Sequence, residues 1–152
     1  MATAQTLTFR MEKVFDCTPD ELWAAWTNPS EFARWISPFP GLDAEVPELD
    51  PRPGGRVRFT MIGPDGARYP EEAVFQVVDR PRELVLLQAN EHRNDIFRGF
   101  PLTMRVRFEP RGKQTRMLFE HSGYPQNFPM DEAKRGFTDC FRKLEDVVRA
   151  RR

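Results

Sequence analysis

The sequence has few of the residues that build disulfide frameworks and metal sites. Among its 152 residues are two cysteines, Cys17 and Cys140, and two histidines, His92 and His121. Two cysteines so far apart in the chain do not make a disulfide framework or a zinc knuckle, and no HExxH motif or His/Cys pair at ligand spacing is present. We therefore expect two half-buried thiols, no bound metal and no cofactor.

An excess of charge of either sign is also absent. Lys and Arg together number 23, as do Asp and Glu, so the formal net charge is zero. A dedicated nucleic-acid-binding protein needs a basic excess to neutralise phosphates, so we expect no nucleic-acid partner. The N-terminal segment has no apolar core of the signal-peptide type, and no window is apolar over a membrane-spanning length. These absences predict a cytoplasmic protein without a membrane span.

Two common catalytic signatures are missing as well. There is no GxSxG motif, and Ser122 beside His121 is only a chain neighbour whose side chain points to the other face of a strand. Gly54 and Gly55 precede a strand and not a helix N-terminus, so they do not form a phosphate-binding loop. What the sequence does have is 39% hydrophobic residues, including 13 Phe. That is enough for the core of a single domain spanning residues 1–152.

Two helix-start signals of the same kind follow each other between residues 18 and 31. Thr18 and Asn28 are capping residues, and each is followed by Pro at the first helical position and by Glu three residues after the cap. The capping oxygen accepts a hydrogen bond from a free backbone N–H, and the acid lies at the positive end of the helix dipole. The pattern predicts two short helices with almost no linker, at residues 19–27 and 29–36.

Alternation of apolar and polar residues predicts strands before and after these helices. The predicted strands or extended segments are residues 6–16, 43–50, 56–61, 70–79, 83–90, 102–109 and 115–121. Arginines with outward parity are expected to pair across strands with Glu109 and Glu120 on a solvated face. These arginines are Arg56, Arg58, Arg105, Arg107 and Arg116.

An amphipathic helix is predicted to close the chain at about residues 130–150 and to lie across the sheet. One stripe of this helix is apolar, and the opposite face is polar and includes Lys143. The apolar stripe consists of Phe137, Phe141, Leu144 and Val148, and it is widened by Ala133, Cys140 and Val147.

The long connection at residues 91–101 contains apolar residues, although a connection of this length is expected to be exposed. These residues are Ile96, Phe97 and Phe100. We expect them to cover the mouth of a cavity or to form a homodimer contact.

The predicted order of one strand, two helices, six strands and a long helix resembles that of the helix-grip, or START-like, domain. Several segments resemble, in order, motifs of the heat-shock-protein-ninety ATPase activator homologue family. This family belongs to the START-like (SRPBCC) superfamily, together with polyketide cyclases and plant lipid-binding allergens. The segments are WTNPSEFARW (26–35), DPRPGGRVRFTM (50–61), DG (65–66), VVDRPRELVL (77–86), TRMLFEHSGYP (115–125) and GFTDCFRKLEDV (136–147).

The resemblance implies an α+β fold in which a curved antiparallel sheet of about six or seven strands surrounds the C-terminal helix, with a cavity between them. It does not imply chaperone activation. The eukaryotic activator stimulates its chaperone mainly through a separate N-terminal domain, and the first strand predicted here lies too near the N-terminus to leave room for one.

One apolar set can either line that cavity or fill it as a packed core, and periodicity alone does not separate the two. The resemblance favours a cavity, which Met and Phe would make adaptable and apolar. The ligand would then be a small hydrophobic or aromatic molecule. The expected ligand-binding residues are Trp35, Phe59, Met61, Phe75, Met104, Val106, Phe119, His121, Phe137 and Phe141.

His121 is the titratable residue expected on the cavity-facing side of its strand, and it has two interpretations. It can be a hydrogen-bonded core histidine, which we favour, or a proton shuttle near neutral pH. The sequence thus favours a binding protein over an enzyme. The alternatives are a cyclase-, dehydratase- or hydrolase-like enzyme that uses His121, and a co-chaperone-like protein-interaction module. A carboxylate within hydrogen-bond reach of His121 would favour catalysis.

Overall fold

One antiparallel sheet of seven strands forms the framework of the part of the chain that the computed structural model describes, residues 6–91, 93 and 95–151. The strands are β1 (Leu7–Phe15), β2 (Glu45–Leu49), β3 (Arg56–Ile62), β4 (Arg68–Asp79), β5 (Glu83–Gln88), β6 (Leu102–Arg111) and β7 (Gln114–Tyr124). The helices are α1 (Pro19–Thr27), α2 (Pro29–Trp35) and α3 (Met130–Arg149). The predicted order of elements and the α+β helix-grip fold are confirmed.

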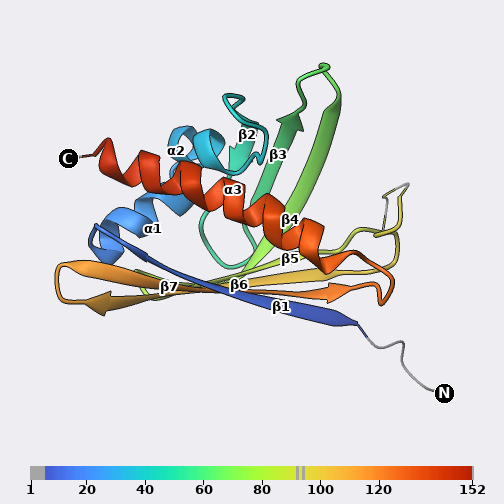
Figure 1. Ribbon diagram of the computed structural model, residues 1–152. Helices are drawn as coiled ribbons and strands as arrows, with labels where there is room; N and C mark the ends of the chain where they lie inside the picture. Colours follow the sequence, from blue (N-terminus) through green and yellow to red (C-terminus); the bar gives the residue numbers. More distant parts are fainter. Residues whose placement is uncertain (1–5, 92, 94, 152) are drawn as a thin grey trace.

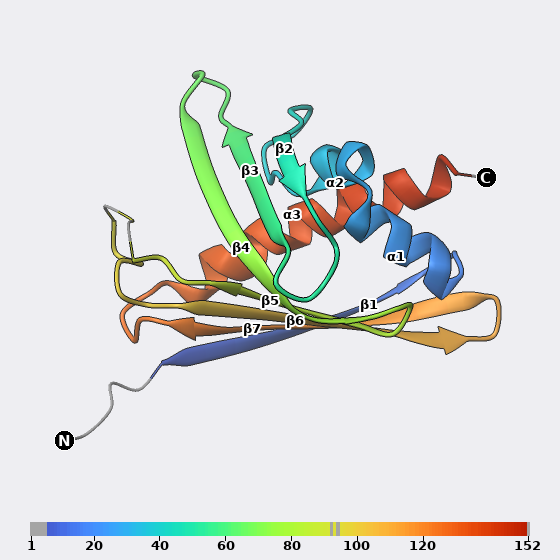
Figure 2. The same ribbon diagram turned by 180° about the vertical axis from the view of Figure 1, so that it is seen from behind.

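The sheet is strongly curved, with strand order β1-β7-β6-β5-β4-β3-β2. β2, β3 and β4 rise away from the layer formed by the other strands, and α3 lies across the concave side (Figures 1 and 2). A bulge between Phe75 and Val77 shifts the register of β4 against β5, and bulges of this kind increase local twist and bending. The first half of β4, residues 68–73, extends past the end of β5 and pairs with β3 alone among the described strands.

Several strand ends differ from the predicted ones by one to three residues, and two of these differences affect the candidate site. β5 ends at Gln88 and not at residue 90, because Asn90 adopts a left-handed backbone conformation with φ of 61°. The Asn90 side chain donates a hydrogen bond to the carbonyl of Phe100 over 2.9 Å, which ties the two ends of the following connection together. β7 continues past His121 to Tyr124, and this extension bears directly on the candidate site described below.

The two short helices begin where the capping signals predicted. Thr18 Oγ1 accepts a hydrogen bond from the backbone N–H of Glu21, and the Glu21 carboxylate accepts one from the backbone N–H of Thr18, at 3.2 and 2.9 Å. Asn28 Oδ1 accepts from the backbone N–H groups of Ser30 and Glu31, at 3.0 and 3.4 Å. These helices close one end of the concave side, next to the C-terminal half of α3 (Figure 1).

Removing either cap is expected to destabilise the protein modestly. Thr18→Ala and Asn28→Ala should each lower the free energy of unfolding by about 1 kcal/mol, because a backbone N–H at the helix start loses its acceptor. Urea unfolding followed by circular dichroism measures the loss. The control variants Thr18→Ser and Asn28→Asp keep a capping oxygen and should unfold at nearly the wild-type urea concentration. If the alanine variants did so as well, the capping hydrogen bonds would not contribute to stability.

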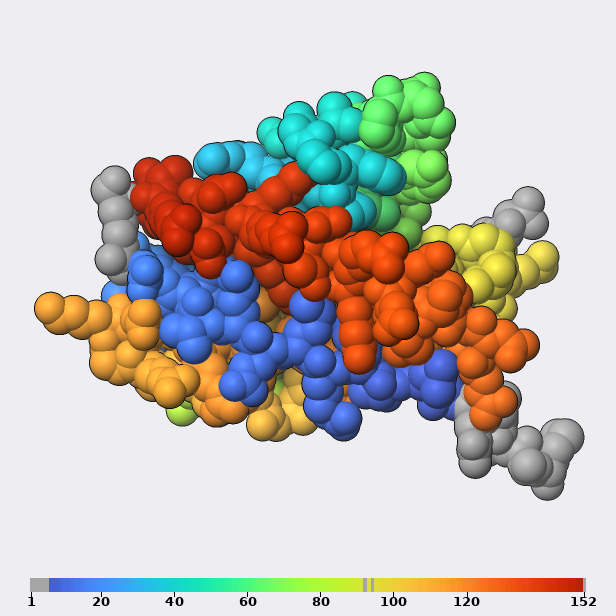
Figure 3. All heavy atoms as spheres, in the orientation of Figure 1, coloured from blue at the N-terminus to red at the C-terminus, as the bar shows by residue number. Residues whose placement is uncertain are grey.

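The apolar stripe of α3 faces the concave side of the sheet as predicted. Phe141, Leu144 and Val148 are buried, whereas Phe137, nearer the start of the helix, is only partly buried. The rings of Phe137 and Phe141 both contact that of Phe119 on β7, at centroid distances of 4.7 and 5.1 Å. In the space-filling view α3 runs across one face of the molecule, with β1 and α1 below it and the β3–β4 hairpin above (Figure 3).

Lys143 corrects the predicted polar face of α3. Lys143 is partly buried, and its ammonium group donates hydrogen bonds to the carbonyls of Ser37, Phe39 and Leu42, at 2.8, 2.6 and 2.8 Å. These carbonyls belong to the segment that follows α2, and the long lysine stem reaches them across the interface between α2 and α3. Both thiols are also more buried than expected, with Cys17 and Cys140 at 0% and 3% exposure.

Candidate functional site

The side chains between the sheet and α3 are fully buried at one end and only partly buried at the other. Near α1 and α2, the rings of Trp26 and Trp35 pack at a centroid distance of 4.6 Å. The ring of Trp35 also contacts that of Phe141, at a centroid distance of 6.2 Å. At the other end, next to the connection at residues 91–101 and the first half of α3, several apolar side chains are only partly buried. They are Met104, Phe97, Phe128, Met130, Ala133 and Phe137.

The ten expected ligand-binding residues fall into three groups. Fully buried are Trp35, Phe75, Val106, Phe119 and Phe141, and His121 is buried among aromatic rings. Partly buried are Phe59, Met61, Met104 and Phe137. The structure brings Phe119, His121, Phe137 and Phe141 into mutual ring contacts. Phe59 and Met61 lie apart from them on β3, where Phe59 contacts Phe32 of α2 at 5.5 Å.

His121 lies at the centre of this interior and is 3% exposed. It sits opposite Phe9 of β1 and Met104 of β6, and its ring contacts those of Phe137 and Tyr124 at 5.2 and 5.0 Å. Burial lowers the pKa of His121 from 6.5 to about 3, so the imidazole is neutral at pH 7. This neutral, buried state was expected.

The hydrogen bonding of His121 is incomplete. Its Nδ1 lies 2.7 Å from the hydroxyl oxygen of Tyr124, whereas its Nε2 has no partner. Among the described residues, Nε2 of His121 and Nε1 of Trp26 are the two buried side-chain polar atoms without a hydrogen bond. A buried polar atom without a partner is costly, so the imidazole offers an unused hydrogen-bonding position inside an otherwise apolar space.

Tyr124 reaches His121 because of a bulge at Gly123. Leu7 pairs with Tyr124 but Thr8 pairs with Ser122, so β7 has one residue more than β1 at this point. Gly123 has φ of 105°, and a Cβ there would lie 2.2 Å from the carbonyl oxygen of Pro101. The bulge turns Tyr124 to the same face as His121, whereas simple alternation would place it on the opposite face.

A polar cluster lies at the partly buried end of the interior. The Glu71 carboxylate on β4 accepts hydrogen bonds from Arg93, at 2.5 Å, and from Gln88, at 2.8 Å. Arg93 also pairs with Asp95 at 2.7 Å, and its guanidinium lies 5.2 Å from the ring centre of Phe97. Burial raises the pKa of Glu71 above its usual range, although Arg93 and Gln88 act in the opposite direction.

This cluster adjoins Tyr124 and closes the end of the interior. Phe97 contacts the rings of Tyr124 and Phe128 at 5.9 and 5.1 Å. Burial, and then the charge of Glu71, raises the pKa of Tyr124, so its hydroxyl keeps its proton. In the apolar part of the connection, Phe97 therefore packs inward, whereas Ile96 is 58% exposed. That Phe97, Ile96 and Phe100 cover a cavity mouth or form a dimer contact stays a prediction.

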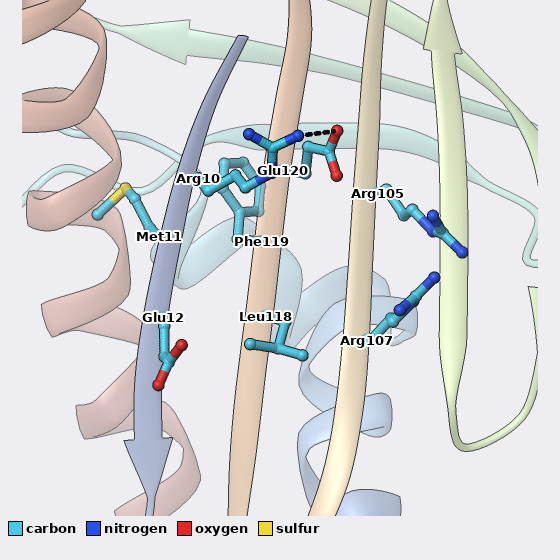
Figure 4. Close-up of a pocket in the computed structure, with 8 residues that line it drawn as sticks. All are labelled: Arg10, Met11, Glu12, Arg105, Arg107, Leu118, Phe119 and Glu120. Carbon is cyan, nitrogen blue, oxygen red and sulfur yellow. Dashed lines mark hydrogen bonds and ion pairs between the residues drawn. The ribbon is translucent and has the colours of Figure 1, made fainter.

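Two surface grooves lie outside the interior. One, of about 330 Å³, crosses the outer face of β1, β7 and β6 over Leu118 (Figure 4). Its arginines are paired, since Arg10 meets Glu120 at 3.4 Å and both Arg105 and Arg107 meet Glu83. Of the predicted cross-strand partners, Glu109 meets Arg116 at 3.2 Å. Glu120 instead meets Arg10, and the other outward arginines pair with Glu83 or Glu48. Because these charges are balanced, this groove offers no free cationic patch.

The other groove, of about 880 Å³, follows β3, β4 and the end of β5 up to residue 95. Its lining includes Phe59, Glu71 and Arg93. Arg93 covers Phe97, Phe97 contacts Tyr124, and Tyr124 is hydrogen-bonded to His121. A continuous series of contacts therefore connects this groove with the buried imidazole.

The arrangement lacks the groups of the common hydrolytic and metal-dependent sites. Within residues 6–91, 93 and 95–151, no three or more His, Cys, Asp or Glu side chains are grouped as metal ligands. No carboxylate hydrogen-bonds His121, whose described partner is the Tyr124 hydroxyl. A neutral imidazole hydrogen-bonded to a phenol, with one nitrogen unused, can orient a bound molecule through a hydrogen bond.

Three residues of this site were not predicted from the sequence: Tyr124, Glu71 and Arg93. The signal for Tyr124 was Gly123, because a glycine inside a strand pattern indicates a bulge. For Glu71 and Arg93 the sequence carries no comparable signal, since their pairing joins β4 to a distant connection.

Comparison with known proteins identifies the family. The model of the family described as "Activator of Hsp90 ATPase homolog 1-like protein" matches residues 16–149. The chain belongs to this family. Its fold is accordingly of the START-like (SRPBCC) type, as the sequence motifs implied. No curated protein matches the chain.

Solved structures of proteins of similar length share this fold at low sequence identity. A protein from Arthrobacter aurescens is 23% identical, with a TM-score of 0.83 over 95% of this chain and 87% of the other. A protein from Chromobacterium violaceum is 16% identical, with a TM-score of 0.81 over 93% and 97%. The AHSA1-like protein from Aeromonas hydrophila is 20% identical, with a TM-score of 0.76 over 95% and 93%. At these identities the likeness concerns the fold alone.

A search of the described helices for a membrane-spanning segment found none of sufficient length and apolar character.

Proposed function

We propose that this protein binds a small, largely apolar or aromatic molecule between the sheet and α3, at the end next to residues 91–101. The observation that carries the proposal is Nε2 of His121, a buried polar atom without a hydrogen-bond partner in aromatic surroundings. Native proteins seldom leave such an atom unsatisfied. A bound molecule with a polar group would complete its hydrogen bonding.

The side chains around this position support an apolar ligand. Met104 lies opposite His121 on β6 and is only partly buried, as is Phe137 on α3. Unbranched Met and planar Phe side chains adapt to ligands of different shape. Phe119 and Phe141 lie deeper and would form the floor of the site.

Phe59 and Met61 would contribute only to a ligand that extends toward β3. The remaining expected residues, Trp35, Phe75 and Val106, are fully buried and would support the site from behind.

The role proposed for His121 is orientation and not turnover. Its pKa is lowered to about 3, which is far from the value near working pH that suits a general base. Its described partner is a phenol and not a carboxylate. The enzyme alternative, with cyclase-, dehydratase- or hydrolase-like chemistry at His121, would require a ligand that itself brings a second titrating group to the imidazole.

The test begins with native mass spectrometry of freshly purified protein and a thermal-shift screen of aromatic and lipid-like compounds. For a compound that binds, the His121→Gln variant should change the affinity by about 10-fold or less, the size of one imperfect hydrogen bond. The control variant Leu118→Ala alters the outer groove and should leave the affinity unchanged.

Three results would contradict the proposal. Turnover of a bound compound by the wild type, with a loss of roughly 100-fold or more in His121→Gln, would establish the enzyme alternative. An affinity that depends on Leu118 and not on His121 would locate binding in the outer groove. Failure to bind any screened compound would remove the basis for a ligand site.

A further inference from the structure

We infer that the ligand is a neutral molecule whose apolar body carries a hydrogen-bond acceptor, typically a carbonyl oxygen, and that this oxygen accepts a hydrogen bond from His121 Nε2–H. The inference rests on the proposed function, because it assigns a chemical class to the molecule bound at that site. The inference depends on which imidazole nitrogen of His121 carries the proton. The hydrogen bond with the neighbouring Tyr124 determines which nitrogen that is.

The hydrogen bond between Tyr124 and His121 has two possible directions. The hydroxyl oxygen of Tyr124 and Nδ1 of His121 are 2.7 Å apart, and the hydroxyl has no other hydrogen-bond partner among the described residues. If Nδ1–H donated, the buried phenol proton and Nε2 would both be unsatisfied. If the phenol donates to Nδ1, one group alone is left over, and that group is Nε2–H.

The second direction leaves fewer buried polar atoms unsatisfied and is therefore favoured. The Gly123 bulge holds Tyr124 on the inner face of β7, so that its hydroxyl stays within reach of His121 Nδ1. The interior thus presents a donor, and a ligand must bring an acceptor.

The charges nearby disfavour an ionised ligand. The cation closest along the series of contacts is Arg93, and its guanidinium is already paired with Glu71 and Asp95. Among the described residues, the two cations that lie over aromatic rings, Lys13 and Arg93, are both paired with acids, so a carboxylate in the aromatic space would lack a free partner there. An ammonium group would face the donor Nε2–H. Because an unpaired buried charge is far more costly than a neutral carbonyl, the acceptor should belong to a neutral group.

The tautomer can be measured in the protein without a ligand. Ring-¹⁵N NMR of protein labelled in histidine should show a protonated nitrogen at Nε2 and a bare nitrogen at Nδ1 for the residue whose signals vanish in His121→Gln. In Tyr124→Phe the phenol donor is gone, and the two tautomers should mix. A proton found at Nδ1 in the wild type overturns the inference.

Ligand class can be tested with two probes of similar size, benzophenone, which carries a ketone oxygen, and diphenylmethane, which does not. The wild type should bind the ketone roughly 3- to 10-fold more tightly, the value of one hydrogen bond. His121→Phe keeps an aromatic ring without nitrogen and should bind both probes equally. Diphenylacetate, an anion of comparable size, should bind more weakly than either probe.

The control variant Trp26→Phe removes the other unsatisfied N–H of the interior. It should leave the preference for the ketone intact, and loss of the preference in this variant would overturn the assignment to His121. Equal binding of both probes by the wild type would refute the inference while the proposed site remained. Binding of neither probe would overturn the site and the inference together.

Discussion

Replacing Phe141 by alanine is expected to lower the free energy of unfolding by about 3–5 kcal/mol, the usual loss for a phenylalanine deleted from a tight core. Phe141 is 2% exposed, and its ring contacts those of Trp35, Phe119 and Phe137. The shortened side chain leaves a cavity among rings that belong to α2, β7 and α3, and these elements cannot all close around it. Urea unfolding at neutral pH measures the loss.

Phe137→Ala is the matched comparison for this variant. Phe137 lies one helical turn earlier on the same stripe but is only partly buried, so its removal creates less new cavity and should cost clearly less. Lys134→Ala, on the exposed face of α3, should be close to neutral. Equal losses for the two phenylalanines would show that the interior is packed equally tightly at both positions, although Phe137 is only partly buried. A loss near zero for Phe141→Ala would contradict the packing of α3 on the sheet.

The stability of the wild type is expected to fall on acidification because of His121. In the unfolded chain this histidine takes up a proton below pH 6.5, whereas in the folded protein burial lowers its pKa to about 3. Its contribution to stability is therefore present above pH 6.5 and is lost as the pH falls toward 3. Between pH 7 and pH 5 the loss should be about 2 kcal/mol.

The measurement compares urea unfolding of the wild type and His121→Gln at pH 7 and pH 5. The glutamine does not titrate, and the carboxylates that do titrate are common to both proteins, so the difference between the two proteins isolates the histidine. The free energy of unfolding of the wild type minus that of the variant should be about 2 kcal/mol lower at pH 5 than at pH 7. A difference independent of pH would mean that His121 is solvated in the folded state.

Local signals in the sequence were sufficient for most of the fold. Thr18 and Asn28 act within three residues of themselves, so their capping bonds could be predicted from spacing alone. Alternation placed His121 and Phe119 on the inner face of β7 correctly, because a strand without a bulge has a fixed period of two. Helical periodicity likewise placed Phe141 toward the sheet.

The rest of the site depends on contacts between distant segments. Lys143 appeared to belong to a solvated helix face, since the carbonyls that bind it lie more than a hundred residues earlier in the chain. Arg93 meets Glu71 only because the connection after β5 folds back over β4. Tyr124 was overlooked because the predicted strand ended at residue 121, before the bulge at Gly123 that turns it inward.

Residues 68–73 of β4 pair with β3 on one side and leave the other edge free among the described strands, which has a consequence for strand addition by a second chain. An exposed strand edge is a template on which a second chain can add a strand. The backbone of Phe75 is hydrogen-bonded to Gly54 and Gly55 on the β3 side, so by alternation Glu72, Pro70 and Arg68 direct their backbone groups to the open side. Proline has no N–H to donate, and it is flanked here by two exposed charged residues. The row of backbone donors along this edge is therefore interrupted at Pro70, which disfavours the addition of a strand from a second chain there.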